Sequence, residues 1–120
     1  MNLNNFEEGL IDQIQAERCK KLLWSVINLA VQDACLAPYA SKPSTDSITA
    51  IRFLIGNEKE AGVDGYLMWL DVDGPEFRRR LVEAMFAERH DKFPDIARRA
   101  FRANFNWWRK NRANYIDDGE

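Results

Sequence analysis

Apolar residues recur every three or four positions along most of this 120-residue chain, and no stretch alternates apolar with polar residues. The first long segment shows the pattern most clearly, with Phe6, Leu10 and Ile14 four apart and similar spacing as far as Leu36. Such spacing is typical of an amphipathic α-helix, whereas a half-buried strand has a period of two. The pattern therefore predicts an all-α fold without β-strands.

Prolines divide the chain into several predicted helices. Pro38 stops the first periodic segment, and a loop rich in Pro and Ser separates it from a second helix. A short apolar helix is predicted over residues 65–70. Pro75 suits the start of the next helix, because its missing donor would be unsatisfied there anyway, and Pro94 opens the last one. We expect one compact helical domain, residues 1–120, of about five helices.

The composition narrows the class of protein. The chain is 46% hydrophobic, which is enough for a core, and 30% charged. No apolar run approaches the roughly 20 residues of a membrane span, and the N-terminus is too polar for a signal peptide. We expect a cytoplasmic protein with reduced thiols at Cys19 and Cys35, which serve as small packing residues.

The residues that usually carry catalysis are scarce. His90 is the only histidine, and we interpret it as a surface residue near a helix C-terminus. The run that begins at Asp71 resembles the start of a calcium loop, but Pro75 and Val82 occupy the fifth and twelfth positions, where ligands are needed. Asp73 is better explained as a helix N-cap. We predict no enzyme activity, no metal, no cofactor and no small-molecule substrate.

The charge is distributed unevenly along the chain. Residues 1–74 carry a net charge of −5, residues 75–112 a net charge of +6, and residues 113–120 a net charge of −3, which together give −2. A dipolar protein of this kind can present a basic face to a polyanion although its overall charge is negative. The alternative is that the two halves complement each other within the fold or across a dimer.

Residues 65–81, GYLMWLDVDGPEFRRRL, have the size and the apolar spacing of a helix-turn-helix unit. In this interpretation Val72 fills the turn, and Phe77 and Leu81 anchor the second helix. That helix then carries Arg78, Arg79 and Arg80 in its first two turns, where a recognition helix meets base edges and phosphates. The alternative is a helical hairpin with a solvated arginine face.

Three segments within residues 22–82 resemble small helical proteins encoded by phages and prophages. WLDVDGPEFRRRL is similar to their tract LLGLDPxxVRxxL, and residues 24–34 are similar to their early helix WxxVIxxAIxDA. Residues 50–54 stand where those proteins have an AxxWL element. Two positions depart from the pattern, since Asp71 replaces the turn glycine and Pro75 is shifted by one. The resemblance implies a phage-related origin and a helix-turn-helix-like unit.

The predicted C-terminal helix, residues 94–114, interleaves basic and aromatic side chains. Basic side chains can bind phosphates while aromatic rings stack on bases. An aromatic stripe at helical spacing, such as Phe101 and Trp108, is also typical of a core or a dimer interface. Both interpretations stay open at this stage.

The sequence favours a small phage-type DNA-binding regulator that uses the helix-turn-helix-like unit on double-stranded DNA. The alternative is a phage-encoded inhibitor or adaptor that binds a host protein or a nucleoprotein complex, including an anti-defence function. A homodimer fits either hypothesis. The predicted contacts to nucleic acid or to a protein partner are Arg78, Arg79, Arg80, Arg98, Arg99, Arg102, Trp108, Arg109, Lys110 and Arg112.

Overall fold

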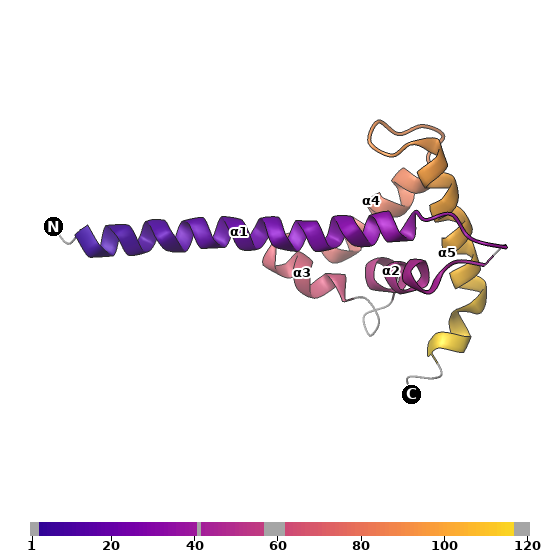
Figure 1. Cartoon of the computed structure of the whole chain (residues 1–120), viewed down its shortest axis with the longest axis horizontal. Helices are drawn as coiled ribbons and strands as arrows, with labels where there is room; N and C mark the ends of the chain where they lie inside the picture. The colour runs from indigo at the N-terminus through magenta and orange to yellow at the C-terminus, as the bar shows by residue number, and fades with distance from the viewer. Residues whose placement is uncertain (1–2, 41, 57–61, 117–120) are drawn as a thin grey trace.

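A computed structural model describes residues 3–40, 42–56 and 62–116 of the chain (Figure 1). Within these residues there is no β-strand, and the one isolated bridge joins Tyr39 and Lys42. The prediction of an all-α, single-domain fold of about five helices is confirmed. The helices are α1 (Leu3–Ala34), α2 (Thr45–Ile55), α3 (Val63–Trp69), α4 (Gly74–Phe86) and α5 (Asp95–Ile116).

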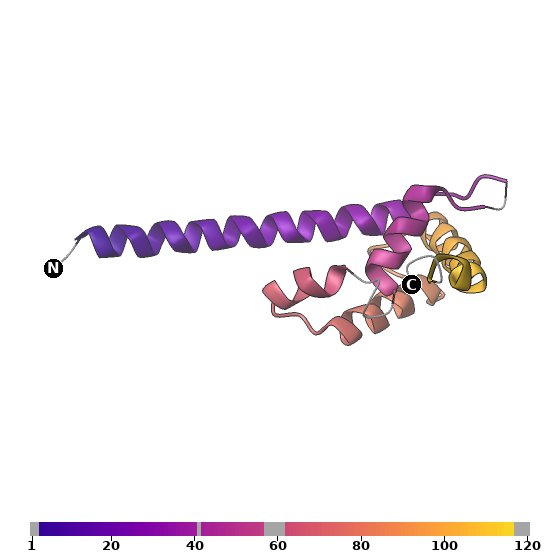
Figure 2. The same ribbon diagram turned by 90° about the horizontal axis from the view of Figure 1, so that it is seen from below.

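Helix α1 has 32 residues and extends far beyond the other helices. Figures 1 and 2 show its C-terminal half beside α2 and α3, while its N-terminal half projects away from the rest of the molecule. Every side chain over residues 12–22 is exposed. The molecule is therefore elongated, with principal extents of 66 × 39 × 23 Å.

Helix α2 is fixed to α1 at its N-terminus. Ser44 caps the helix, because its hydroxyl oxygen accepts a hydrogen bond of 3.1 Å from the backbone N–H of Ser47. The buried hydroxyl of Ser47 in turn donates to the carbonyl oxygen of Asp33 at 2.8 Å. Ile51 and Leu54 on the same helix are fully buried in the core.

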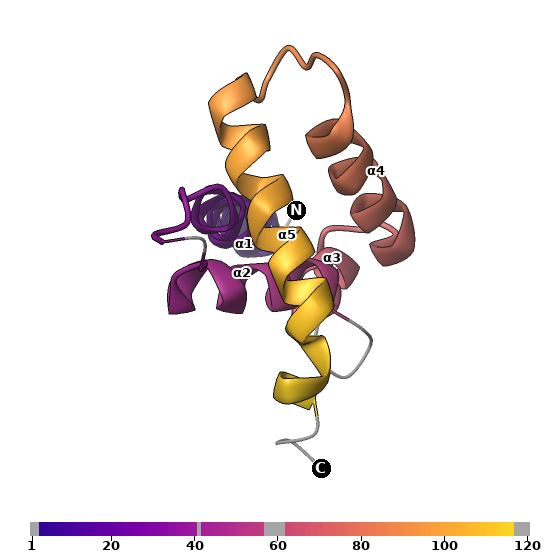
Figure 3. The same cartoon turned by 90° about the vertical axis from the view of Figure 1, so that its right-hand side faces the viewer.

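Helix α5 crosses the C-terminal end of α1 and packs against α2 and α4 (Figure 3). Its aromatic stripe forms much of the core, since Phe101, Phe105 and Trp108 are all buried. Phe101 and Phe105 stack with a centroid distance of 5.9 Å. The interpretation of these aromatics as core residues is therefore the one that the fold supports.

Several helix ends differ from the sequence prediction. The short helix begins at Val63, before the predicted residue 65, and the last helix begins at Asp95, one residue after Pro94. Helix α4 ends at Phe86, well before His90. His90 therefore lies in the α4–α5 loop, where its Nδ1 accepts a hydrogen bond of 3.1 Å from the backbone N–H of Lys92.

Candidate functional site

The α3–turn–α4 segment contains the residues that the sequence predicts to form a helix-turn-helix-like unit. Asp71 adopts a left-handed backbone conformation, with φ of 57°, directly after α3. Glycine adopts this conformation with the least strain, and aspartate tolerates it better than most residues. The next residue, Val72, donates its backbone N–H to the carbonyl oxygen of Leu67 at 2.9 Å. Asp71 therefore serves as the turn residue in place of a glycine.

The inward-facing residues of this unit also lie as predicted. Val72 and Phe77 are half-buried and pack against the core, and Leu81 is buried within it. Asp73 caps α4, because its carboxylate accepts a hydrogen bond of 3.3 Å from the backbone N–H of Glu76. The aspartates near the turn are thus explained by local backbone structure.

The first arginine of the predicted DNA-contacting row is turned toward its own fold. Arg78 forms an ion pair with Asp64, which connects α4 to α3. The side chain of Arg78 is largely covered, with 19% of its surface exposed. The carboxylate of Asp64 also approaches the backbone at Gly74, the first residue of α4. Arg78 therefore fixes the angle between the two helices.

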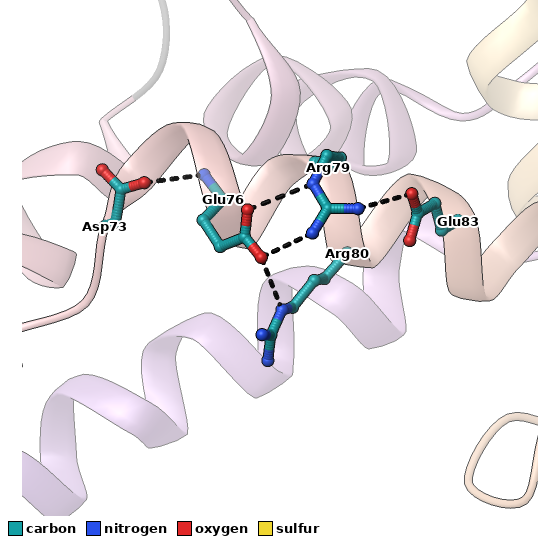
Figure 4. A network of polar contacts seen from close by, with 5 residues as sticks. All are labelled: Asp73, Glu76, Arg79, Arg80 and Glu83. Carbon is teal, nitrogen blue, oxygen red and sulfur yellow. Dashed lines mark hydrogen bonds and ion pairs between the residues drawn. The ribbon is translucent and has the colours of Figure 1, made fainter.

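The other two arginines share carboxylates on the surface of α4 (Figure 4). Arg79 contacts Glu76 at 2.5 Å and Glu83 at 2.6 Å, and Arg80 contacts the same oxygen of Glu76 at 2.8 Å. Hydrogen bonds from Arg79 and Arg80 lower the pKa of Glu76 to about 2, and the two carboxylates raise the pKa of Arg79. Arg78, Arg79 and Arg80 thus form ion pairs with three carboxylates in total.

Arg98 is a buried structural residue, with 4% of its surface exposed. Its guanidinium donates to the carbonyl oxygen of Phe93 at 3.0 Å, to that of Glu88 at 3.4 Å, and to that of Ala87. These carbonyl groups lie at or after the C-terminus of α4, where helix geometry leaves them without intrahelical partners. Arg98 therefore ties the α4–α5 loop to α5.

Arg99 and Arg102 differ in what they contact. Arg102 donates from Nη1 to the carbonyl oxygen of Met85 at 2.8 Å, so it also satisfies the end of α4. Arg99 is exposed and pairs with Asp95, one turn earlier on α5, at 2.7 Å. The three arginines therefore do not form one basic surface.

The remaining predicted contacts lie near the end of α5. Trp108 is buried, and the guanidinium of Arg112 lies 5.1 Å from the centre of its ring. The guanidinium of Arg109 lies 5.5 Å from the ring of Phe105. Lys110 and Arg109 are exposed. Of the ten predicted contacts, Arg109 and Lys110 are the neighbouring pair that presents positive charge on one exposed stretch of helix.

A groove lies between α1 and α4 in the described part of the chain. Its volume is about 670 Å³, and most of its lining is apolar. Helix α1 contributes Trp24, Ile27 and Val31, while Val72 and Phe77 come from the turn and α4. Grooves with such linings are common binding sites for ligands and partner helices.

Charged side chains also line this groove. Asp73 and Glu76 accept hydrogen bonds within α4, and Arg80 pairs with Glu76 at 2.8 Å. Lys92, which also lines the groove, is exposed in the α4–α5 loop. The groove therefore combines an apolar floor with an exposed lysine.

This groove is not among the features that the sequence predicts. The apolar residues of α1 between Trp24 and Val31 cover more of the helix surface than one neighbouring helix needs. Trp24 and Val31 are seven apart and share a face. This second apolar face is the feature of the sequence that could have indicated a further binding surface on α1, in addition to the surface that packs on α2.

A smaller apolar patch lies at the end of α3. Met68 and Trp69 are adjacent, and 72% and 74% of their respective surfaces are exposed. Tryptophan is among the residues most often found at binding hot spots. This patch lies beside the turn that precedes α4.

Comparison with known proteins gives no family for the chain: no family model, no curated protein and no solved structure matches it.

The geometry offers no metal site among the described residues, since no three His, Cys, Asp or Glu side chains gather there. None of the helices in the described segments is both long and apolar enough to cross a membrane. Burial raises the pKa of the Cys35 thiol to about 11, which keeps it protonated at neutral pH. Cys35 is therefore a packing residue, as the sequence suggests.

Proposed function

We propose that this chain is a protein-binding module, an adaptor or inhibitor that holds an amphipathic helix of a partner protein in the α1–α4 groove. The observation that carries the proposal is the groove itself, with its apolar floor and its volume of about 670 Å³. Helix-in-groove recognition places the apolar face of a partner helix into such a site. The resemblance to phage-encoded proteins suggests a host protein as the partner.

The charges at the groove indicate the chemistry of the partner. Lys92 is exposed and lines the groove, so a helix that carries acidic residues beside its apolar face fits best. Trp24, which is partly exposed at the groove, provides an aromatic anchor of the kind that dominates binding energies. We infer a partner helix with large apolar side chains and a flanking acidic residue.

The predicted DNA-contacting arginines are already paired within the chain, and this supports a protein partner over DNA. Arg78 pairs with Asp64, and Glu76 pairs with both Arg79 and Arg80. DNA phosphates would have to compete with these carboxylates for the same guanidinium groups. Arg98 and Arg102 donate to carbonyl oxygens at the end of α4, so contact with a DNA phosphate would compete with these hydrogen bonds.

Site-specific photo-crosslinking tests the proposal. A photoreactive phenylalanine analogue replaces Trp24 in the groove, and in a matched control it replaces Ile96, which is 82% exposed and lies outside the groove. We expect one protein to crosslink at Trp24 and not at Ile96. Mass spectrometry of the crosslinked peptide should place the contact on an amphipathic helix with acidic residues.

Binding of the purified partner then measures the role of the groove. We expect Val31→Lys to weaken binding at least about tenfold, because it places a charge in the apolar floor. Thr49→Lys is the control, since Thr49 lies on α2 in the shallow α1–α2 groove. Equal crosslinking at Trp24 and Ile96, or unchanged affinity of Val31→Lys, would exclude the groove as the binding site.

Binding to double-stranded DNA is the second candidate, and the turn geometry favours it. The left-handed Asp71 and the Val72–Leu67 hydrogen bond define the turn between α3 and α4, the two helices that would form the DNA-reading unit. A salt titration with duplex DNA tests this candidate. Contact with about four phosphates would give a log–log slope near −3.6, at about −0.9 per phosphate. Loss of that binding in Arg79→Ala and Arg80→Ala would favour DNA over a protein partner.

A further inference from the structure

The projecting half of α1, which we name the arm (residues 3–22), extends beyond the other helices. All side chains over residues 12–22 are exposed, and Figures 1 and 2 show this part of the helix away from the other helices in both views. Most of the stability of a helix in a protein comes from the tertiary packing of its apolar face. The arm therefore gains stability if another surface covers it.

The exposed side of α1 carries an apolar stripe that continues from the arm toward the body. Leu22 and Leu29 are seven residues apart, with 66% and 58% of their surfaces exposed. Ile14 and Val26 are exposed on the same side of the helix, opposite to the buried Ile27. Spacing of this kind is used by helices that pair with other helices.

The charges of the arm are separated along its length. Glu7, Glu8 and Asp12 are the only charged residues in 3–12, and the segment 18–21 carries Arg18, Lys20 and Lys21. The acidic group precedes Ile14 along the chain, and the basic group follows it together with one acidic residue, Glu17, so that residues 15–22 keep a net positive charge. The two segments therefore have opposite charge at similar distances from one central position.

We propose that two copies of this chain pair through their arms in antiparallel orientation, with Ile14 near the two-fold axis. In that register Glu7 of one copy lies level with Lys21 of the other, seven residues from the centre on each side. The acidic segment then meets a basic segment twice, once in each half of the pair. A parallel pair would instead place acidic beside acidic and basic beside basic segments.

The shape of the molecule leaves room for this pairing. The tip of one arm reaches the other copy near Ser25, where the outward side of α1 is exposed. Helices α2, α3 and α5 pack against α1, and the buried Ala34 and Ile27 lie on the side of α1 that faces the core. The dimer therefore leaves the α1–α4 groove open, and the inference is independent of the proposed function.

Sedimentation equilibrium of the whole protein at low ionic strength tests the pairing. At about 100 μM we expect the wild-type protein to have twice its chain mass of 14.0 kDa. The variant Arg18→Glu, Lys20→Glu, Lys21→Glu should dissociate at least about tenfold more readily, because both halves of the interface become acidic against acidic. The variant Glu7→Lys, Glu8→Lys, Asp12→Lys should do the same with basic charges.

Mixing the two variants separates charge pairing from loss of folding. An equimolar mixture should recover the mass of a dimer, since each acidic segment then meets a basic one. A control with the same change of charge outside the arm, Arg89→Glu, Arg99→Glu, Lys110→Glu, should dimerise like the wild-type protein. Circular dichroism should show all variants to be helical.

Three results would overturn the proposal. A wild-type protein that stays at 14.0 kDa at about 100 μM has no such interface. If the variant Arg18→Glu, Lys20→Glu, Lys21→Glu still dimerised, the arms would not pair in antiparallel orientation. In a parallel pair these positions face their own copies, so the change only replaces repulsion between basic groups with repulsion between acidic groups. A mixture of the two arm variants that fails to associate would show that arm charges do not direct the contact.

Discussion

The side-chain amide nitrogen of Asn104 lies 2.9 Å from the carbonyl oxygen of Ala34, the last residue of α1. The same nitrogen lies 2.7 Å from the carbonyl oxygen of Leu36, so one buried amide satisfies two backbone groups at the end of the longest helix. These two hydrogen bonds join α5 to positions that precede Asn104 by 70 and 68 residues in the sequence. Asn104 thereby fixes where α5 crosses α1.

Replacing this amide should destabilise the fold. We expect Asn104→Ala to lower the free energy of unfolding by about 2–3 kcal/mol, because it removes two buried hydrogen bonds and leaves a cavity. Urea denaturation measures the change. Asn106→Ala, at an exposed position of α5, should change stability by less than about 0.5 kcal/mol. Equal effects of the two variants would contradict the role assigned to Asn104.

Arg98 should be intolerant of substitution although it lies in a basic stretch. We expect Arg98→Met to lower the free energy of unfolding by about 2–4 kcal/mol, because carbonyl groups at the end of α4 lose their donor. Arg98→Lys should be only slightly more stable than Arg98→Met, since an ammonium group cannot donate to several carbonyl groups with the forked geometry of the guanidinium. Thermal and urea unfolding measure both variants.

The neighbouring arginine provides the control. Arg99→Met removes a surface pair with Asp95 and should cost no more than about 0.5 kcal/mol. If Arg98→Met and Arg99→Met had equal stability, Arg98 would not hold the α4–α5 loop. If Arg98→Met folded normally and lost only the binding of a partner, it would be a contact residue, as the sequence suggests.

The sequence predicts the local structure of this chain well. Apolar spacing gives the five helices, and Asp73 is recognisable as a cap because it stands directly before Gly74 and Pro75. The carboxylates of Glu76 and Glu83 were also readable as partners of Arg79, since pairs three and four apart on a helix lie side by side. These features depend on residues that are close in the sequence.

Features that depend on distant residues could not be predicted. Arg98 resembles its exposed neighbour Arg99 in the sequence, and only the return of the α4–α5 loop brings the carbonyl groups of α4 to it. The pairing of Arg78 with Asp64 depends on the angle between two helices. The α1–α4 groove depends on where α4 lies relative to α1, which apolar spacing alone does not define.

The turn at Asp71 should respond to substitution as a left-handed position does. Asp71→Gly should raise the free energy of unfolding by up to about 1 kcal/mol, because glycine adopts a φ of 57° without strain. Asp71→Val should lower it by about 1–2 kcal/mol, since a β-branched side chain is strained in this conformation. Urea denaturation measures both changes.

Asp91, an exposed residue in the α4–α5 loop without a positive φ, serves as the comparison. Asp91→Gly should not stabilise the protein, because there glycine only adds freedom to the unfolded chain. A stabilising effect of Asp71→Val, or the same effect of glycine at both positions, would contradict a strained turn.

Glu76 should make stability depend on pH in the acid range. Its pKa is lowered to about 2 by hydrogen bonds from Arg79 and Arg80, whereas an unfolded glutamate has a pKa near about 4.3. A carboxyl group with a lowered folded pKa stabilises the fold fully above its unfolded pKa, and this contribution is lost as the pH falls toward about 2. We expect Glu76→Gln to reduce the loss of stability between these two pH values.

The size of this effect should be small, because the Glu76 carboxylate is accessible to solvent and salt weakens its ion pairs. Carboxyl-carbon NMR should show that Glu76 titrates well below ordinary glutamates at low ionic strength and moves back toward them in salt. Arg80→Gln should also raise the pKa of Glu76, whereas Arg89→Gln, at an exposed position beyond the end of α4, should not. A Glu76 carboxyl that titrates like an ordinary glutamate in the wild-type protein would mean that Arg79 and Arg80 are not held by it and are available to another anion.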